Sequence, residues 1–186
     1  MHAAPKADMT TPLVFTFVGA DRPGLVQQLS RTVADHGGNW LESRMSALAG
    51  QFAGIVQVEV PLANAPALRA ALVALSAHNL SVVVAPSPGA PNVGDARQWQ
   101  LAIVGNDRPG IVREVSQSLA ARHISVREME TRITSAAMSG DPLFEASATI
   151  EVPQTLDLDE LRNQLDSIAD ALTVHIDLDD TSVTNR

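Results

Sequence analysis

The sequence repeats itself at a distance of 86 residues, and this repeat constrains the fold more than any other feature. The segment GADRPGLV at 19–26 returns as GNDRPGIV at 105–112. Eight of the sixteen residues from Gly19 onward are identical to those 86 positions later. Between the copies, residues 85–95 are rich in proline and glycine, which is typical of a linker. The repeat predicts two domains of one plan.

The expected boundaries follow from this repeat. We expect an N-terminal tail at 1–11, a first domain at 12–85, a linker at 86–97, a second domain at 98–178 and a C-terminal tail at 179–186. Later correspondences have larger offsets: LESRM at 41–45 resembles METRI at 129–133, and Pro61 matches Pro153. We therefore place most of the extra length around Ser135–Pro142, as a longer hairpin loop.

Each copy shows the same order of hydrophobic patterns. An apolar run (Leu13–Val18, Gln98–Val104) precedes a helical stripe, then two extended runs, a second helix and a closing strand (Leu80–Val84, Leu172–Ile176). The order βαββαβ, twice, predicts an α+β protein of two tandem ferredoxin-like domains, each with an antiparallel sheet covered by both helices on one face. The apolar alternation breaks near Val126, where we predict a β-bulge.

Composition excludes several functions. The net charge is −8, which disfavours direct binding to nucleic acid or anionic membranes. Without cysteine and with Lys6 as its one lysine, the chain offers no thiolate or lysine chemistry. We find no metal-binding pattern, no apolar run that could span a membrane, no secretory signal and no nucleophile–base signature. We therefore expect a non-enzymatic cytoplasmic protein without metal or cofactor.

The repeated Asp-Arg-Pro-Gly is the candidate site. Aspartate is a preferred helix N-cap and proline is tolerated in a first helical turn, so the motif predicts helix starts after the first strands. Helix N-termini present free N–H groups and attract anions, and arginine pairs well with a carboxylate. The alternative is that the motif only starts a helix. The candidate residues are Asp21, Arg22, Pro23 and Gly24, then Asn106, Asp107, Arg108, Pro109 and Gly110.

Tandem βαββαβ units with this motif resemble ACT domains, and a chain of two such units resembles the glycine cleavage system transcriptional repressor group. The motif also resembles the N-terminal ACT domain of formyltetrahydrofolate deformylases, whose catalytic domain we do not expect here. The resemblance implies that the protein binds a small amino acid, such as glycine. Asn39 matches an asparagine that ACT domains often place at the start of the second strand, and Ser125 is its counterpart.

The resemblance further implies an indirect action on transcription, through a protein regulator that itself binds DNA. Sites in ACT domains often lie between two modules, and the two sites here need not be equivalent: one could bind the effector while the other is structural. Open sheet faces and edges predict a homodimer. An alternative is an interaction adaptor in which both turns are purely structural.

Overall fold

In the computed structural model, which describes residues 9–87, 96–136 and 140–180, the chain divides into two compact units, Met1–Pro91 and Asn92–Arg186. The first contains β1 (Thr10–Ala20), α1 (Leu25–Asp35), β2 (Asn39–Leu48), β3 (Gln51–Pro61), α2 (Ala65–Ala74), a 3-10 turn η1 (Leu75–His78) and β4 (Leu80–Pro86). The second contains β5 (Ala96–Asn106), α3 (Ile111–Ala120), β6 (Ser125–Ser135), β7 (Pro142–Pro153), α4 (Leu158–Leu172) and β8 (Val174–Asp180).

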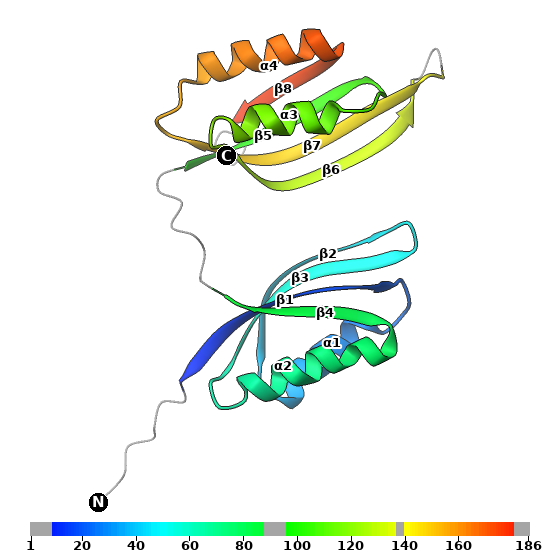
Figure 1. The fold of residues 1–186 in the computed structure, drawn as a ribbon, viewed down its shortest axis with the longest axis vertical. Coiled ribbons are helices and arrows are strands. Elements are labelled where there is room, and N and C mark those ends of the chain that lie inside the picture. The colour runs from blue at the N-terminus through cyan, green and yellow to red at the C-terminus, as the bar shows by residue number, and fades with distance from the viewer. Residues whose placement is uncertain (1–8, 88–95, 137–139, 181–186) are drawn as a thin grey trace, which may run out of the picture. The chain divides into compact units, whose positions relative to one another are not determined.

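Both units have the predicted α+β topology. The strand orders are β2-β3-β1-β4 and β6-β7-β5-β8, and every pairing is antiparallel. In each unit both helices lie on one face of the sheet (Figure 1). This is the ferredoxin-like βαββαβ plan, present twice. The predicted linker falls largely on residues 88–95, which lie outside the described residues, as do 137–139 and the ends of the chain, so the domain boundaries stay a prediction.

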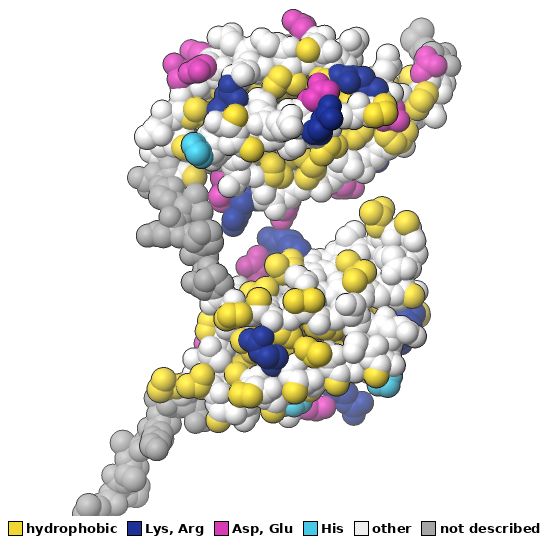
Figure 2. Space-filling view, in the orientation of Figure 1, with side chains coloured by type: hydrophobic (Ala, Val, Ile, Leu, Met, Phe, Trp, Pro, Cys, Tyr) yellow, Lys and Arg dark blue, Asp and Glu magenta, His cyan; other side chains and the backbone are white. Residues whose placement is uncertain are grey.

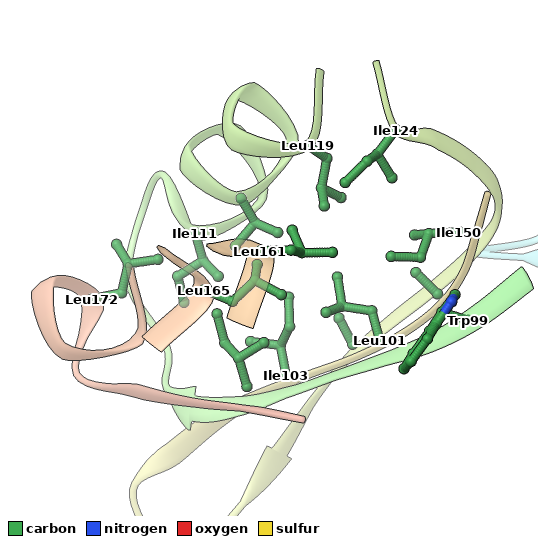
Figure 3. Close-up of a cluster of buried hydrophobic side chains, with 14 of the residues drawn as sticks. Trp99, Leu101, Ile103, Ile111, Leu119, Ile124, Ile150, Leu161, Leu165 and Leu172 are labelled. Carbon is green, nitrogen blue, oxygen red and sulfur yellow. The ribbon is translucent and has the colours of Figure 1, made fainter. Parts of the chain in front are cut away.

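Each domain has its own apolar core between sheet and helices. In the first, Phe15, Leu29 and Leu72 are completely buried. In the second, Leu101, Leu119 and Leu161 are among the leucines and isoleucines that interdigitate below α3 and α4 (Figure 3). Trp99 closes one end of that core. Burial of such side chains is worth about 1.5–3 kcal/mol each, which explains why the two halves keep the same apolar spacing.

The sheet registers correct one correspondence. Glu42 pairs with Gln57 and Glu128 pairs with Thr149, so Glu42 corresponds to Glu128, and the offset along the second strand remains 86. The match of LESRM with METRI at 88 was wrong, because two similar Glu-x-Arg patterns lie out of structural register. The extra length of the second copy lies in the β6–β7 hairpin, as predicted: the first copy turns in two residues, Ala49 and Gly50, both with positive φ.

The predicted bulge near Val126 is confirmed, since the β6–β7 register shifts between Val126 and Glu128. The first copy has the same shift between Trp40 and Glu42. The predicted closing strand Leu172–Ile176 starts too early. Leu172 is buried at the end of α4, and β8 runs from Val174 to Asp180 instead.

The outer faces of the two sheets differ although their backbones correspond. On the first sheet Ile55 and Val83 point outward, 47% and 65% exposed, in one row across neighbouring strands with Thr16. The matching row on the second sheet holds Ser147 and Asp177 on either side of Ala102. The first row therefore carries two exposed apolar side chains, with Arg44 paired to Ile55 at its edge, whereas the second row carries the acidic Asp177.

Candidate functional site

The Asp-Arg-Pro-Gly segment links the first strand of each domain to its first helix, but the helix starts later than predicted. The N-caps of α1 and α3 are Gly24 and Gly110, with φ of 91° and 103°, and no side chain caps either helix. Asp21 was predicted as the N-cap and that was wrong, because it lies three residues too early. Glycine fits here because other residues rarely adopt this left-handed conformation.

The uncapped start leaves donors at the surface. In α4, by contrast, the Asp157 carboxylate accepts hydrogen bonds from the amides of Asp159 and Glu160. No side-chain oxygen does this in α1 or α3. The first-turn amides of a helix have no acceptor within the helix, so these two turns are the better places for an external anion.

A backbone hydrogen bond fixes each turn to the neighbouring hairpin. The amide of Asp21 donates to the carbonyl of Gly50 at 2.9 Å, and the amide of Asp107 donates to that of Pro142 at 3.0 Å. Asp21 and Asp107 are exposed, so their carboxylates face solvent beside the helix starts. Each turn thus has one amide engaged and one carboxylate that could accept a hydrogen bond from an ammonium group.

A shallow, open hollow lies against each turn. The first, about 330 Å³, is lined by Asp21, Arg22, Gly24, Leu25, Val26, Gln27 and Phe52. The second, about 470 Å³, is lined by Asp107, Arg108, Gly110, Ile111, Val112, Arg113, Ile133 and Phe144. Phe52 pairs with Gly19 near the end of β1, and Phe144 pairs with Gly105 near the end of β5, so the two phenylalanines occupy equivalent positions. Each hollow therefore combines a charged turn with an aromatic floor.

Arg22, the arginine of the first turn, contacts a neutral side chain of α1. Arg22 is exposed, and its Nη2 donates to Gln28 Oε1 at 3.3 Å. Gln28 lies at the fourth position of α1 and is neutral. Among the described residues no carboxylate is paired with this guanidinium, which lies next to the first hollow.

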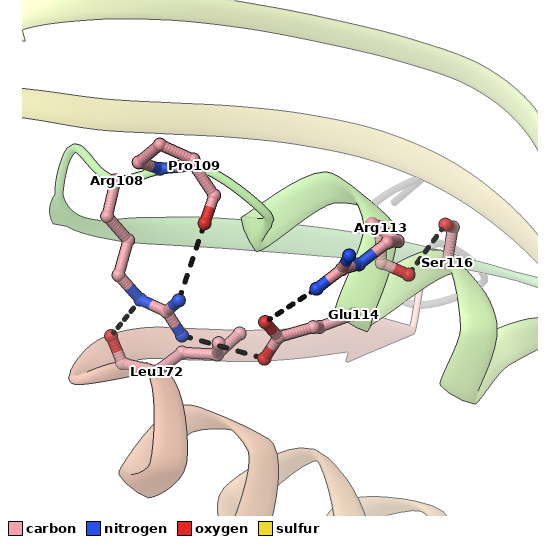
Figure 4. Close-up of polar contacts among 6 residues, drawn as sticks. All are labelled: Arg108, Pro109, Arg113, Glu114, Ser116 and Leu172. Carbon is pink, nitrogen blue, oxygen red and sulfur yellow. Dashed lines mark hydrogen bonds and ion pairs between the residues drawn. The ribbon is translucent and has the colours of Figure 1, made fainter.

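Arg108, the arginine of the second turn, contacts three groups (Figure 4). Its Nε donates to the carbonyl of Leu172 at 3.3 Å and Nη1 to that of Pro109 at 3.5 Å, while Nη2 lies 3.5 Å from Glu114 Oε2. The other oxygen of Glu114 lies 3.7 Å from Arg113. Figure 2 shows acidic and basic side chains gathered over α3, beside apolar ones. Arg108 is thus half-buried and paired with a carboxylate of the helix that follows its turn.

Asn39 and Ser125 lie at the opposite end of their sheets from the turns. They are equivalent, because they pair with Glu59 and Glu151 at matching places. Both are exposed, and within one domain neither approaches the turn. Pro23 and Pro109 lie within the turns, and Asn106 is the last residue of β5, paired with Leu143. The structure thus brings together the motif residues of each copy but not the residue that opens the second strand.

Sequence reasoning missed Gln28, Glu114, Phe52 and Phe144. Gln28 and Glu114 lie six residues after Arg22 and Arg108, which precede the helices, so the spacing rule for side chains three or four residues apart in one helix does not predict these contacts. The two phenylalanines were not foreseeable from the motif, because they come from the third strands. Among the described residues, no three histidine or acidic side chains form a metal-binding group.

Comparisons with known proteins agree with this architecture. The ACT domain model of one family matches residues 11–84, and a second ACT domain model matches residues 94–175. A crystal structure of an unknown protein from Galdieria sulphuraria has 28% identity and a TM-score of 0.79, covering 93% of this chain and 99% of that one. No curated protein matches by sequence.

A second solved structure is of a protein provisionally assigned as a glycine cleavage system transcriptional repressor. It has 22% identity and a TM-score of 0.67, and the match covers 92% of this chain and 97% of that one. At this identity the likeness concerns the fold. None of the helices formed by the described residues combines the length and hydropathy needed to cross a membrane.

Proposed function

The chain belongs to the ACT domain family, with two ACT domains in tandem, and we propose that it is a non-enzymatic regulator that binds a small amino acid such as glycine. The observation that carries this proposal is the open hollow at the uncapped start of α1. There the exposed Arg22 and the first-turn amides suit a carboxylate, and the carboxylate of Asp21 suits an ammonium group. A zwitterionic amino acid carries a carboxylate and an ammonium group close together, so its binding site must offer a positively and a negatively charged group equally close together.

Isothermal titration of the full chain tests the proposal. We expect glycine, serine or a branched-chain amino acid to bind, and Arg22→Ala to weaken that binding about tenfold or more, since a charge-assisted hydrogen bond is worth about 1.5–3 kcal/mol. Arg31→Ala, which removes an exposed arginine on the far part of α1, is the matched control and should bind like the wild type. No heat with any of these amino acids at millimolar concentration would refute amino acid binding.

The proposed output is a change in transcription through a protein regulator, in the cytoplasm where that regulator acts. The net charge of −8 opposes direct binding to DNA phosphates. The likeness to a provisionally assigned transcriptional repressor supports the same direction. We expect the purified chain to give no anisotropy change with duplex DNA at physiological salt, while deleting its gene changes glycine-responsive transcripts. Micromolar DNA binding by the chain alone would contradict an indirect action.

We further propose a homodimer that pairs the outer faces of two first-domain sheets. Ile55, Val18 and Val83 form an apolar strip on this face, bordered by the exposed Glu42–Arg44 ion pair of β2, whereas Asp177 and its neighbours would be costly to bury on the second sheet. Light scattering should give about twice 19.7 kDa. Val83→Asp should dissociate the dimer, and Val73→Asp, at an exposed valine of α2, should not. A monomeric wild type would refute it.

A further inference from the structure

The two turns differ at one position that faces the arginine. Gln28 and Glu114 both come four residues after the motif glycine, and each is the side chain of its own helix that contacts the motif arginine. One is a neutral amide and the other is a carboxylate. A second charge differs beside it, since Arg113, which pairs with Glu114, stands where the first domain has the neutral Gln27.

Glu114 holds the place that a ligand carboxylate would take. Its oxygens lie 3.5 Å from Arg108 and 3.7 Å from Arg113, so both face guanidinium groups. Arg108 is also turned toward the end of α4, where its Nε donates to the carbonyl of Leu172. An incoming carboxylate would have to displace these partners and would be repelled by Glu114.

In the part of the chain that the structure describes, no carboxylate is paired with Arg22. Its contact is the oxygen of Gln28, an amide that donates as well as accepts and carries no charge. The counterpart of Leu172 is His78, because each precedes a residue with positive φ, Asn79 or Thr173, before the last strand. Among the hydrogen bonds of the described residues, Arg22 makes none to His78.

We propose that the first domain holds the tighter effector site and that Glu114 acts as an internal carboxylate that weakens amino acid binding at the second turn. This inference rests on the proposed amino acid binding. The residue at position 28 or 114 then sets which domain binds more tightly: an amide leaves the arginine available, and a carboxylate engages it. The pair is partly solvated, so its effect is modest, about fivefold in affinity.

Exchange of the two residues tests this proposal in the full chain, with glycine and serine as titrants. We expect a tighter and a weaker site per wild-type chain, the tighter one weakened about tenfold or more in Arg22→Ala and kept in Arg108→Ala. Gln28→Glu should weaken the tighter site about fivefold, whereas Gln28→Ala, which adds no charge, should stay within about twofold. Glu114→Gln should strengthen the weaker site about fivefold, and Arg108→Ala in the same chain should abolish that gain.

The outcomes separate the two ideas. Two equal sites in the wild type, or loss of binding in Arg108→Ala and not in Arg22→Ala, would overturn the assignment of the first domain while leaving amino acid binding intact. A Glu114→Gln variant whose weaker site gains no affinity would overturn the role of Glu114. No binding by the wild type would overturn the proposed function and this inference together. Circular dichroism of each variant confirms that it is folded.

Discussion

The two domains have nearly the same backbone, and they differ most where side chains leave the core. At core positions the exchanges are apolar for apolar, such as Leu25 for Ile111 and Phe15 for Leu101. On the outer sheet face, Val83 corresponds to Asp177. The difference shows that burial against the helices restricts one face of the sheet, while the other face is free to acquire a separate role in each copy.

The comparison holds only if each domain is stabilised by its own core, and the largest expected effect tests this. Leu29→Ala and Leu119→Ala each remove a buried leucine from the first helix of one domain, which should cost about 2–5 kcal/mol. Hydrogen exchange followed by mass spectrometry should show lost protection in the altered domain alone. Equal loss in both domains would mean that they unfold as one unit.

A smaller effect tests whether the two turns have the same backbone requirement. Gly24→Ala and Gly110→Ala place a Cβ at φ of 91° and 103°, which should cost about 1–2 kcal/mol. A Cβ at Gly24 would meet nothing closer than 4.0 Å, whereas at Gly110 it would lie 3.3 Å from Glu114 Oε1. We expect a slightly larger loss in urea unfolding for Gly110→Ala. A gain in stability for either variant would contradict the left-handed conformation.

The smallest effect concerns the polar face of the second sheet. Hydrogen bonds from Thr134 Oγ1 and from Arg132 hold the pKa of Glu145 below its ordinary value. Because the folded pKa is lowered, the associated stability is present above the unfolded pKa and is lost as pH falls through the folded pKa. The matching residue of the first sheet is Ala53, so only the second domain has this acid-sensitive contribution.

Thr134→Val should raise the pKa of Glu145, as measured by NMR titration of the side-chain carboxyl, while Thr16→Val, on the outer face of the first sheet, leaves it unchanged. An unaltered pKa in Thr134→Val would show that Arg132 alone sets the value.

The fold was predictable from the sequence because it depends on periodicity and repetition. The apolar alternation in 144–152 and the shared helical stripes fix the strands, the helices and their order. The bulge near Val126 could also be foreseen from its broken alternation. The end of α4 could not, because Leu172 suits a buried helix end and a strand equally well. Packing against the rest of the domain places Leu172 in α4, and a local sequence pattern carries no information on that packing.

The site was predictable in part. The motif located both helix starts, since its residues are adjacent in sequence. The state of Arg108 depends on Leu172, which is 64 residues away, and the state of both arginines depends on the charge of the residue at position 28 or 114. The aromatic floor comes from a different strand. Such features arise from the way distant segments meet, and a single sequence does not reveal them.

The amide-to-carbonyl bond between each motif aspartate and its hairpin has a practical consequence. Leu48 and Ser135 lie beside Gly50 and Pro142, the residues that accept those bonds. Since the chain contains no cysteine, Leu48→Cys or Ser135→Cys would give one thiol for a fluorescent dye. A dye at either position would report occupancy of its own turn, so the two halves of the molecule could be read out separately in the same solution.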